Sequence, residues 1–63
     1  MDEMSRDELI KVSIEEFSRL QTYMKLTDES SSVYDLMFTR YIELKVFLTS
    51  AGVNLSQLDR VSK

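Results

Sequence analysis

Hydrophobic residues recur every three or four positions near the start of the chain, which is the spacing of one face of an α-helix. Ser5 and Glu8 stand three residues apart at the beginning of this pattern, as in a capping box that closes a helix N-terminus. The pattern predicts a helix over about residues 6–26. The apolar face of this helix consists of Leu9, Ile10, Ile14, Phe17, Leu20, Tyr23 and Met24.

The six residues 27–32, Thr-Asp-Glu-Ser-Ser-Ser, interrupt the hydrophobic pattern. Such side chains hydrogen-bond to nearby backbone and favour turns and helix caps, and a connection of this length suits two antiparallel helices. Asp28 or one of the serines is expected to cap a second helix over about residues 31–51. The seam expected to pack on the first helix consists of Val33, Met37, Tyr41, Leu44, Leu48 and Ala51.

A second apolar stripe runs along the same predicted helix, on roughly the opposite side from the seam. It consists of Phe38, Ile42 and Val46, which are spaced four residues apart. A helix that is apolar on most of its circumference is buried on more than one side. A hairpin of two helices offers only one partner, so this stripe requires a further covering surface.

Gly52 follows the second helix and is expected to end it in the left-handed conformation. Asn54 and Gln57 have the spacing of a new capping box, which predicts a short third helix over about residues 55–61. The predicted fold is therefore all-α: an antiparallel helical hairpin with a short third C-terminal helix, in a single domain spanning residues 1–63.

Two interpretations of the Phe38, Ile42 and Val46 stripe remain open. The third helix can fold back over the stripe, with a cover made of Leu55, Leu58 and Val61. Alternatively, the stripe is buried against another molecule, either a second copy or a protein partner. The second interpretation is favoured because a chain of 63 residues without cysteine has little core and no disulfide to stabilise it.

The expected assembly is a four-helix-bundle-like homodimer. Tyr34, which lies near the connecting loop, is a further candidate contact with a partner, since tyrosine combines a large apolar body with a polar tip. The predicted partner-binding residues are thus Phe38, Ile42, Val46 and Tyr34.

Catalytic chemistry has little support in the composition. The chain has no histidine, no cysteine and a single glycine, so it lacks the common nucleophile–base pairs and a glycine-rich phosphate loop. The acidic residues Asp28, Glu29 and Asp35 do not have the spacing of a calcium-binding loop. We therefore expect a protein that is not an enzyme and has neither a cofactor nor a metal site.

The net charge of −3 disfavours attraction to phosphate backbones. No apolar run approaches the roughly 18 residues that span a bilayer, and residues 1–4 are acidic where a secretory signal would be basic and apolar. The composition thus predicts a cytoplasmic protein that neither enters a membrane nor binds nucleic acid.

The segment from Leu48 to Val61 nevertheless resembles the helix-turn-helix pattern, with Gly52 at the turn and Leu58 and Val61 at two core positions. The resemblance covers about a quarter of the chain and departs from the pattern at Leu48, where a small residue is usual. It implies, as an alternative function, a DNA-binding module whose groove-facing residues are Ser56, Gln57 and Arg60. The favoured function is a small regulator or adaptor that binds a protein through the second helix.

Overall fold

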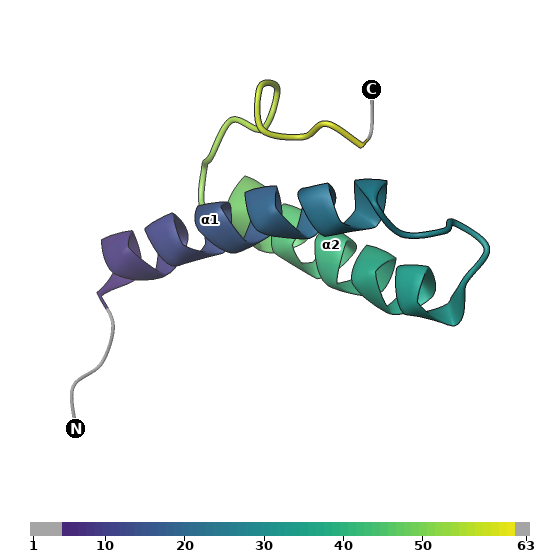
Figure 1. Ribbon diagram of the computed structural model, residues 1–63. Helices are drawn as coiled ribbons and strands as arrows, with labels where there is room; N and C mark the ends of the chain where they lie inside the picture. Colours follow the sequence, from purple (N-terminus) through teal and green to yellow (C-terminus); the bar gives the residue numbers. More distant parts are fainter. Residues whose placement is uncertain (1–4, 62–63) are drawn as a thin grey trace.

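The computed structural model describes residues 5–61, which form two helices and no strand (Figure 1). Helix α1 spans Arg6–Lys25 and helix α2 spans Ser32–Ser50, and the two pack against each other as a hairpin. The chain then runs back across the helices as an irregular segment. The predicted all-helical hairpin is confirmed. Neither helix is long and apolar enough to cross a membrane. The expected localisation is also based on the acidic residues 1–4, which lie outside the described range.

The capping box predicted for α1 is present. The backbone N–H of Glu8 donates to the Ser5 hydroxyl oxygen at 3.1 Å, and the Ser5 N–H donates to the Glu8 carboxylate at 3.4 Å. Two N–H groups that the first turn leaves without helical partners are satisfied in this way.

Among the candidates for the α2 cap, Ser31 takes the role. Its hydroxyl oxygen accepts a hydrogen bond from the Tyr34 N–H at 3.1 Å. Asp28 organises the preceding turn instead, since its carboxylate accepts from the Ser30 N–H at 3.0 Å and from the Ser30 hydroxyl at 2.9 Å. The loop therefore uses its polar side chains on its own backbone, as turn chemistry predicts.

Gly52 ends α2 as expected, with a φ of 88°. The N–H of Gly52 donates to the carbonyl of Thr49 at 3.1 Å, and the N–H of Val53 donates to the carbonyl of Leu48 at 2.9 Å. These two bonds define a Schellman motif, which satisfies carbonyls of the last turn and reverses the chain direction.

The predicted third helix over residues 55–61 is wrong. Only one turn forms there, in which the N–H groups of Leu58 and Asp59 both donate to the Leu55 carbonyl. The next N–H groups bond elsewhere: that of Arg60 donates to the Gln21 side chain, and that of Val61 donates to the Asp59 carboxylate. These tertiary and local side-chain bonds replace the backbone ladder that a helix would need.

The core lies between the two helices and is small. Its fully or almost fully buried apolar members are Phe17 and Met24 from α1 and Tyr41, Leu44 and Leu48 from α2. Partly buried side chains surround them, namely Ile10, Ile14, Leu20, Tyr34, Met37, Phe47, Val53, Leu55 and Leu58. The C-terminal segment thus contributes three residues to the core without being helical.

Three residues assigned to the packing faces lie further out than expected. Val33 is 52% exposed, and Leu9 and Tyr23 are also among the exposed residues. Each lies at the edge of its helix face, where the neighbouring helix does not reach. The assignments of Tyr41, Leu44 and Leu48 to the seam are confirmed, because all three are buried.

Candidate partner-binding site

The stripe on α2 is an exposed apolar surface. Phe38 is 42% exposed, Ile42 is 40% exposed and Val46 is 60% exposed. The stripe starts beside the core, since the Phe38 ring contacts the ring of Tyr41 at a centroid distance of 5.5 Å. From there it passes to the outer side of α2, because residues spaced four apart drift around a helix of 3.6 residues per turn.

Residues 53–61 do not cover this stripe. Their apolar members Leu55 and Leu58 pack against the core between the helices, and Val61 is itself exposed. Their polar contacts reach α1 and the inner side of α2, through Gln21 and Tyr41. Of the alternative cover, Leu55 and Leu58 therefore lie over the interhelical groove, and residues 53–61 leave the stripe exposed.

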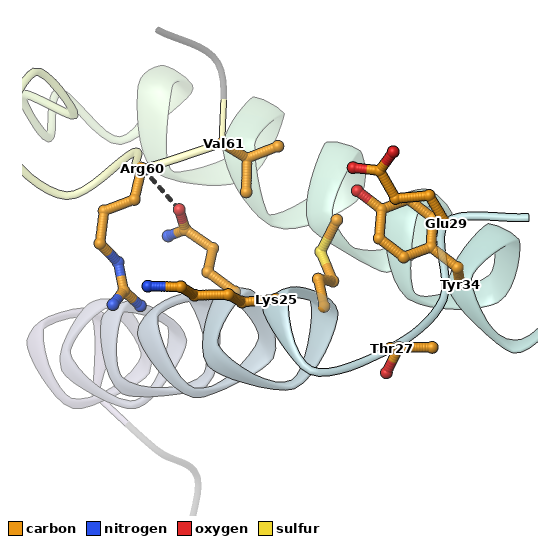
Figure 2. A pocket seen from close by; sticks show the side chains of 8 residues that line it. Lys25, Thr27, Glu29, Tyr34, Arg60 and Val61 are labelled. Carbon is orange, nitrogen blue, oxygen red and sulfur yellow. Dashed lines mark hydrogen bonds between the residues drawn. The ribbon is translucent and has the colours of Figure 1, made fainter.

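Tyr34 lies apart from the stripe. It is partly buried against the core and lines a cleft of about 530 Å³. Figure 2 shows Tyr34 in this cleft with Glu29 and Thr27 from the loop, while Arg60 and Val61 border its other side. The four residues predicted to bind a partner thus do not form one surface: three share the outer side of α2 and Tyr34 belongs to the cleft.

The residues predicted for DNA binding are not on a helix. Ser56 and Gln57 lie in the single turn after Asn54, whose side chain accepts from the Ser56 N–H at 2.9 Å. Arg60 turns toward α1, where its guanidinium donates to the Ser18 carbonyl at 2.7 Å. The second helix of the helix-turn-helix pattern is absent from residues 54–61, so this geometry does not present these side chains as a recognition helix would.

Charged residues join the helices away from the stripe. Arg40 donates to both carboxylate oxygens of Glu16, at 2.7 Å from Nε and 3.0 Å from Nη2, and also to Glu43 at 3.3 Å. The hydrogen bond from Arg40 lowers the pKa of Glu16, against the opposing effect of desolvation, and the same contacts raise the pKa of Arg40. This bidentate pair links α1 to α2 on the exposed surface.

A polar network under the C-terminal segment was not anticipated from the sequence. Gln21 is buried at 3% exposure and bonds to the backbone of Leu58 and Arg60. Asp59 accepts a hydrogen bond from the Tyr41 hydroxyl at 2.6 Å and pairs with Lys45 at 3.0 Å. One signal was available: Gln21 interrupts the apolar face of α1, four residues after Phe17 and three before Met24.

Residues 5–61 contain no group of three or more acidic, histidine or cysteine side chains placed to hold a metal ion. No family model, curated protein or solved structure matches the chain.

Proposed function

We propose that this chain is a non-enzymatic regulator or adaptor that binds another protein through the α2 stripe of Phe38, Ile42 and Val46. The observation that supports the proposal is the exposure of these three side chains, at 40–60%, while residues 53–61 pack between the two helices and not on the stripe. Apolar anchors at positions i, i+4 and i+8 suit pairing with another helix or with an apolar groove.

The free energy that burial of the stripe would release is large for a domain of this size. Burying an apolar side chain completely contributes roughly 1.5–3 kcal/mol, and about half of that remains available where half of the side chain is exposed. Three such residues would contribute a few kcal/mol before the costs of association. That is a large fraction of the roughly 5–15 kcal/mol that stabilises a typical domain.

Self-association into a four-helix dimer is the form that we propose for the isolated protein. Two stripes from two copies can face each other with the same residues on both sides, as a two-fold interface requires. A larger protein partner would use the same anchors, and self-association and partner binding would then compete. We further propose that the protein acts in the cytoplasm.

Sedimentation equilibrium at several protein concentrations tests the proposal. Ile42→Asp places a charge in the stripe and is expected to lower the association constant at least tenfold. Leu36→Asp is the matched control, since Leu36 is 73% exposed on the same helix but outside the stripe. A wild-type chain that stays monomeric, and whose pull-down partners are unaffected by Ile42→Asp, would contradict the proposed function.

A further inference from the structure

The groove between α1 and α2 holds residues 53–61 of the same chain, and it holds them in the way that a protein holds a peptide. After the Schellman motif at Gly52 this segment has one turn and no regular hydrogen bonding with itself. It is kept in place by the side chains of Gln21 and Tyr41 and by the Ser18 carbonyl, which accepts a hydrogen bond from Arg60. It can therefore leave the groove without breaking a backbone hydrogen bond inside α1 or α2.

Gln21 binds the backbone of this segment. Its amide nitrogen donates to the Leu58 carbonyl at 2.8 Å, and its amide oxygen accepts from the Arg60 N–H at 2.5 Å. A primary amide carries one acceptor and two donors, and so matches the alternating carbonyl and N–H groups of a peptide. Because these contacts do not involve the bound side chains, they are available to any segment with a similar backbone course.

Specificity comes from α2, at a subsite made by Tyr41 and Lys45. The Tyr41 hydroxyl donates to one carboxylate oxygen of Asp59 at 2.6 Å, and the Lys45 ammonium lies 3.0 Å from the other. The Asp59 side chain is only 8% exposed in this position. A hydroxyl donor and a cation that converge on one buried carboxylate select an acidic residue over its amide.

Two apolar positions precede the acid. Leu55 and Leu58 pack against the core, and they are separated by the single turn of the segment. The bound pattern is therefore Leu-x-x-Leu-Asp. Past Arg60 and Val61 the groove continues into the cleft of about 530 Å³ that α1 and the loop line with Lys25, Thr27 and Glu29 (Figure 2). This cleft offers room for a segment longer than the one that occupies the groove.

We propose that this groove is a docking site for a segment of a partner protein with the pattern Leu-x-x-Leu-Asp, and that residues 53–61 occupy it in cis as a competitor. A tethered competitor has an effective concentration on the order of millimolar, so the free segment gains access only when it binds well or when the tether is weakened. The proposal does not depend on the α2 stripe, which lies outside this groove.

The test uses the full chain and a fluorescent peptide with the sequence of residues 53–61. The double variant Leu58→Ala with Asp59→Ala weakens the internal segment and leaves the groove intact. Fluorescence polarisation should show this variant binding the peptide at least tenfold more tightly than the wild type does. Adding Gln21→Leu or Lys45→Ala should abolish that gain, whereas adding Ile42→Asp should leave it unchanged.

A second peptide, with asparagine in place of the aspartate, is the matched ligand control and should bind at least fivefold more weakly. Equal binding of the two peptides, or no gain in the double variant when circular dichroism shows it to be folded, would overturn the proposal. A double variant that forms dimers by exchanging this segment between copies would also overturn it, since the occupant would then be a second copy.

A wild-type measurement keeps the test decisive if the double variant does not fold. Millimolar peptide added to the isotopically labelled chain should shift the side-chain amide resonances of Gln21 and the backbone resonance of Arg60 in a saturable manner. The asparagine peptide should shift them less at the same concentration. Resonances that stay in place at the highest peptide concentration would show that the groove does not exchange its occupant.

Discussion

Phe17 of α1 and Tyr41 of α2 stack with their ring planes 10° apart and their centroids 5.3 Å apart. Both side chains are fully buried, and they are among the largest residues in the core. Tyr41 also contacts Phe38 and, through its hydroxyl, Asp59. One ring therefore connects the helix pair, the outer stripe and the C-terminal segment.

Removal of the Phe17 ring should unfold much of the protein. Large-to-small substitutions of a buried phenylalanine cost about 3–5 kcal/mol, which approaches the whole stability expected for a domain of this size. Urea denaturation followed by circular dichroism should show Phe17→Ala as largely unfolded or strongly destabilised. Tyr23→Ala, at an exposed site on the same helix, is expected to change stability by less than about 0.5 kcal/mol.

The two adjacent serines at the start of α2 should differ sharply on substitution. Ser31→Ala removes the acceptor for the Tyr34 N–H and is expected to cost about 1 kcal/mol. Ser32→Ala lies in the first turn and should be neutral or slightly stabilising, since alanine has the better helix propensity. Equal effects in thermal denaturation would show that Ser31 is not the cap.

Substitution of Gly52 should lower the stability of the protein through the backbone conformation at this position. A Cβ at this position meets no atom within 4 Å, so the penalty comes from the φ of 88° and not from a clash. Gly52→Ala is expected to lower the free energy of unfolding by about 1–2 kcal/mol. Gly52→Asn should lose less, because asparagine enters the left-handed region more readily. An alanine variant as stable as the wild type would refute this explanation.

Stability should fall in acid through the pair of Glu16 and Arg40. Arg40 lowers the pKa of Glu16 below its ordinary value of 4.5, so the folded state holds the proton less tightly than the unfolded state. This contribution is present above the unfolded pKa and is lost as the pH falls through the lower, folded value. Glu16→Gln should therefore flatten the decrease of the melting temperature below about pH 4.5.

Asp28 acts in the same direction, because hydrogen bonds from Ser30 lower its pKa as well. Glu16→Gln is thus expected to remove only part of the acid dependence. The pH dependence of the Lys45 contribution runs the other way: its hydrogen bond to Asp59 raises its pKa, so the contribution is fully present below the ordinary value of 10.5 and is lost as the pH rises through the higher, folded value. An unchanged acid profile in Glu16→Gln would contradict the role assigned to the ion pair.

Local signals predicted both helices and their ends, because periodicity, the Ser5 and Glu8 box and the left-handed Gly52 depend on near neighbours in the sequence. The same reasoning failed at residues 55–61. Asn54 and Gln57 have helical spacing, but the backbone groups that would continue a helix bond to Gln21 on α1. A contact between residues almost forty positions apart does not produce a periodic pattern in the sequence, so it could not be predicted from local spacing.

The stripe could be anticipated for a related reason. Its spacing is local, and its separation from the seam follows from helix geometry alone. The sequence did not reveal which side the C-terminal segment would cover, because this depends on Asp59 reaching Tyr41 and Lys45. The chemistry of Tyr34 and its place near the loop predict a partner contact, and the structure places this residue in the cleft, apart from the stripe.

Loss of one hydroxyl should loosen the C-terminal segment while the core stays intact. Tyr41→Phe keeps the ring that stacks on Phe17 and removes the donor to Asp59. A hydrogen bond to a charged group contributes about 1.5–3 kcal/mol, so exchange of the Arg60 amide hydrogen should accelerate by about tenfold or more. Tyr34→Phe is the matched control and should leave this rate unchanged. If the Arg60 amide exchanges equally fast in Tyr41→Phe and the wild type, the Tyr41 hydroxyl does not help to hold the segment and is not a determinant of the subsite.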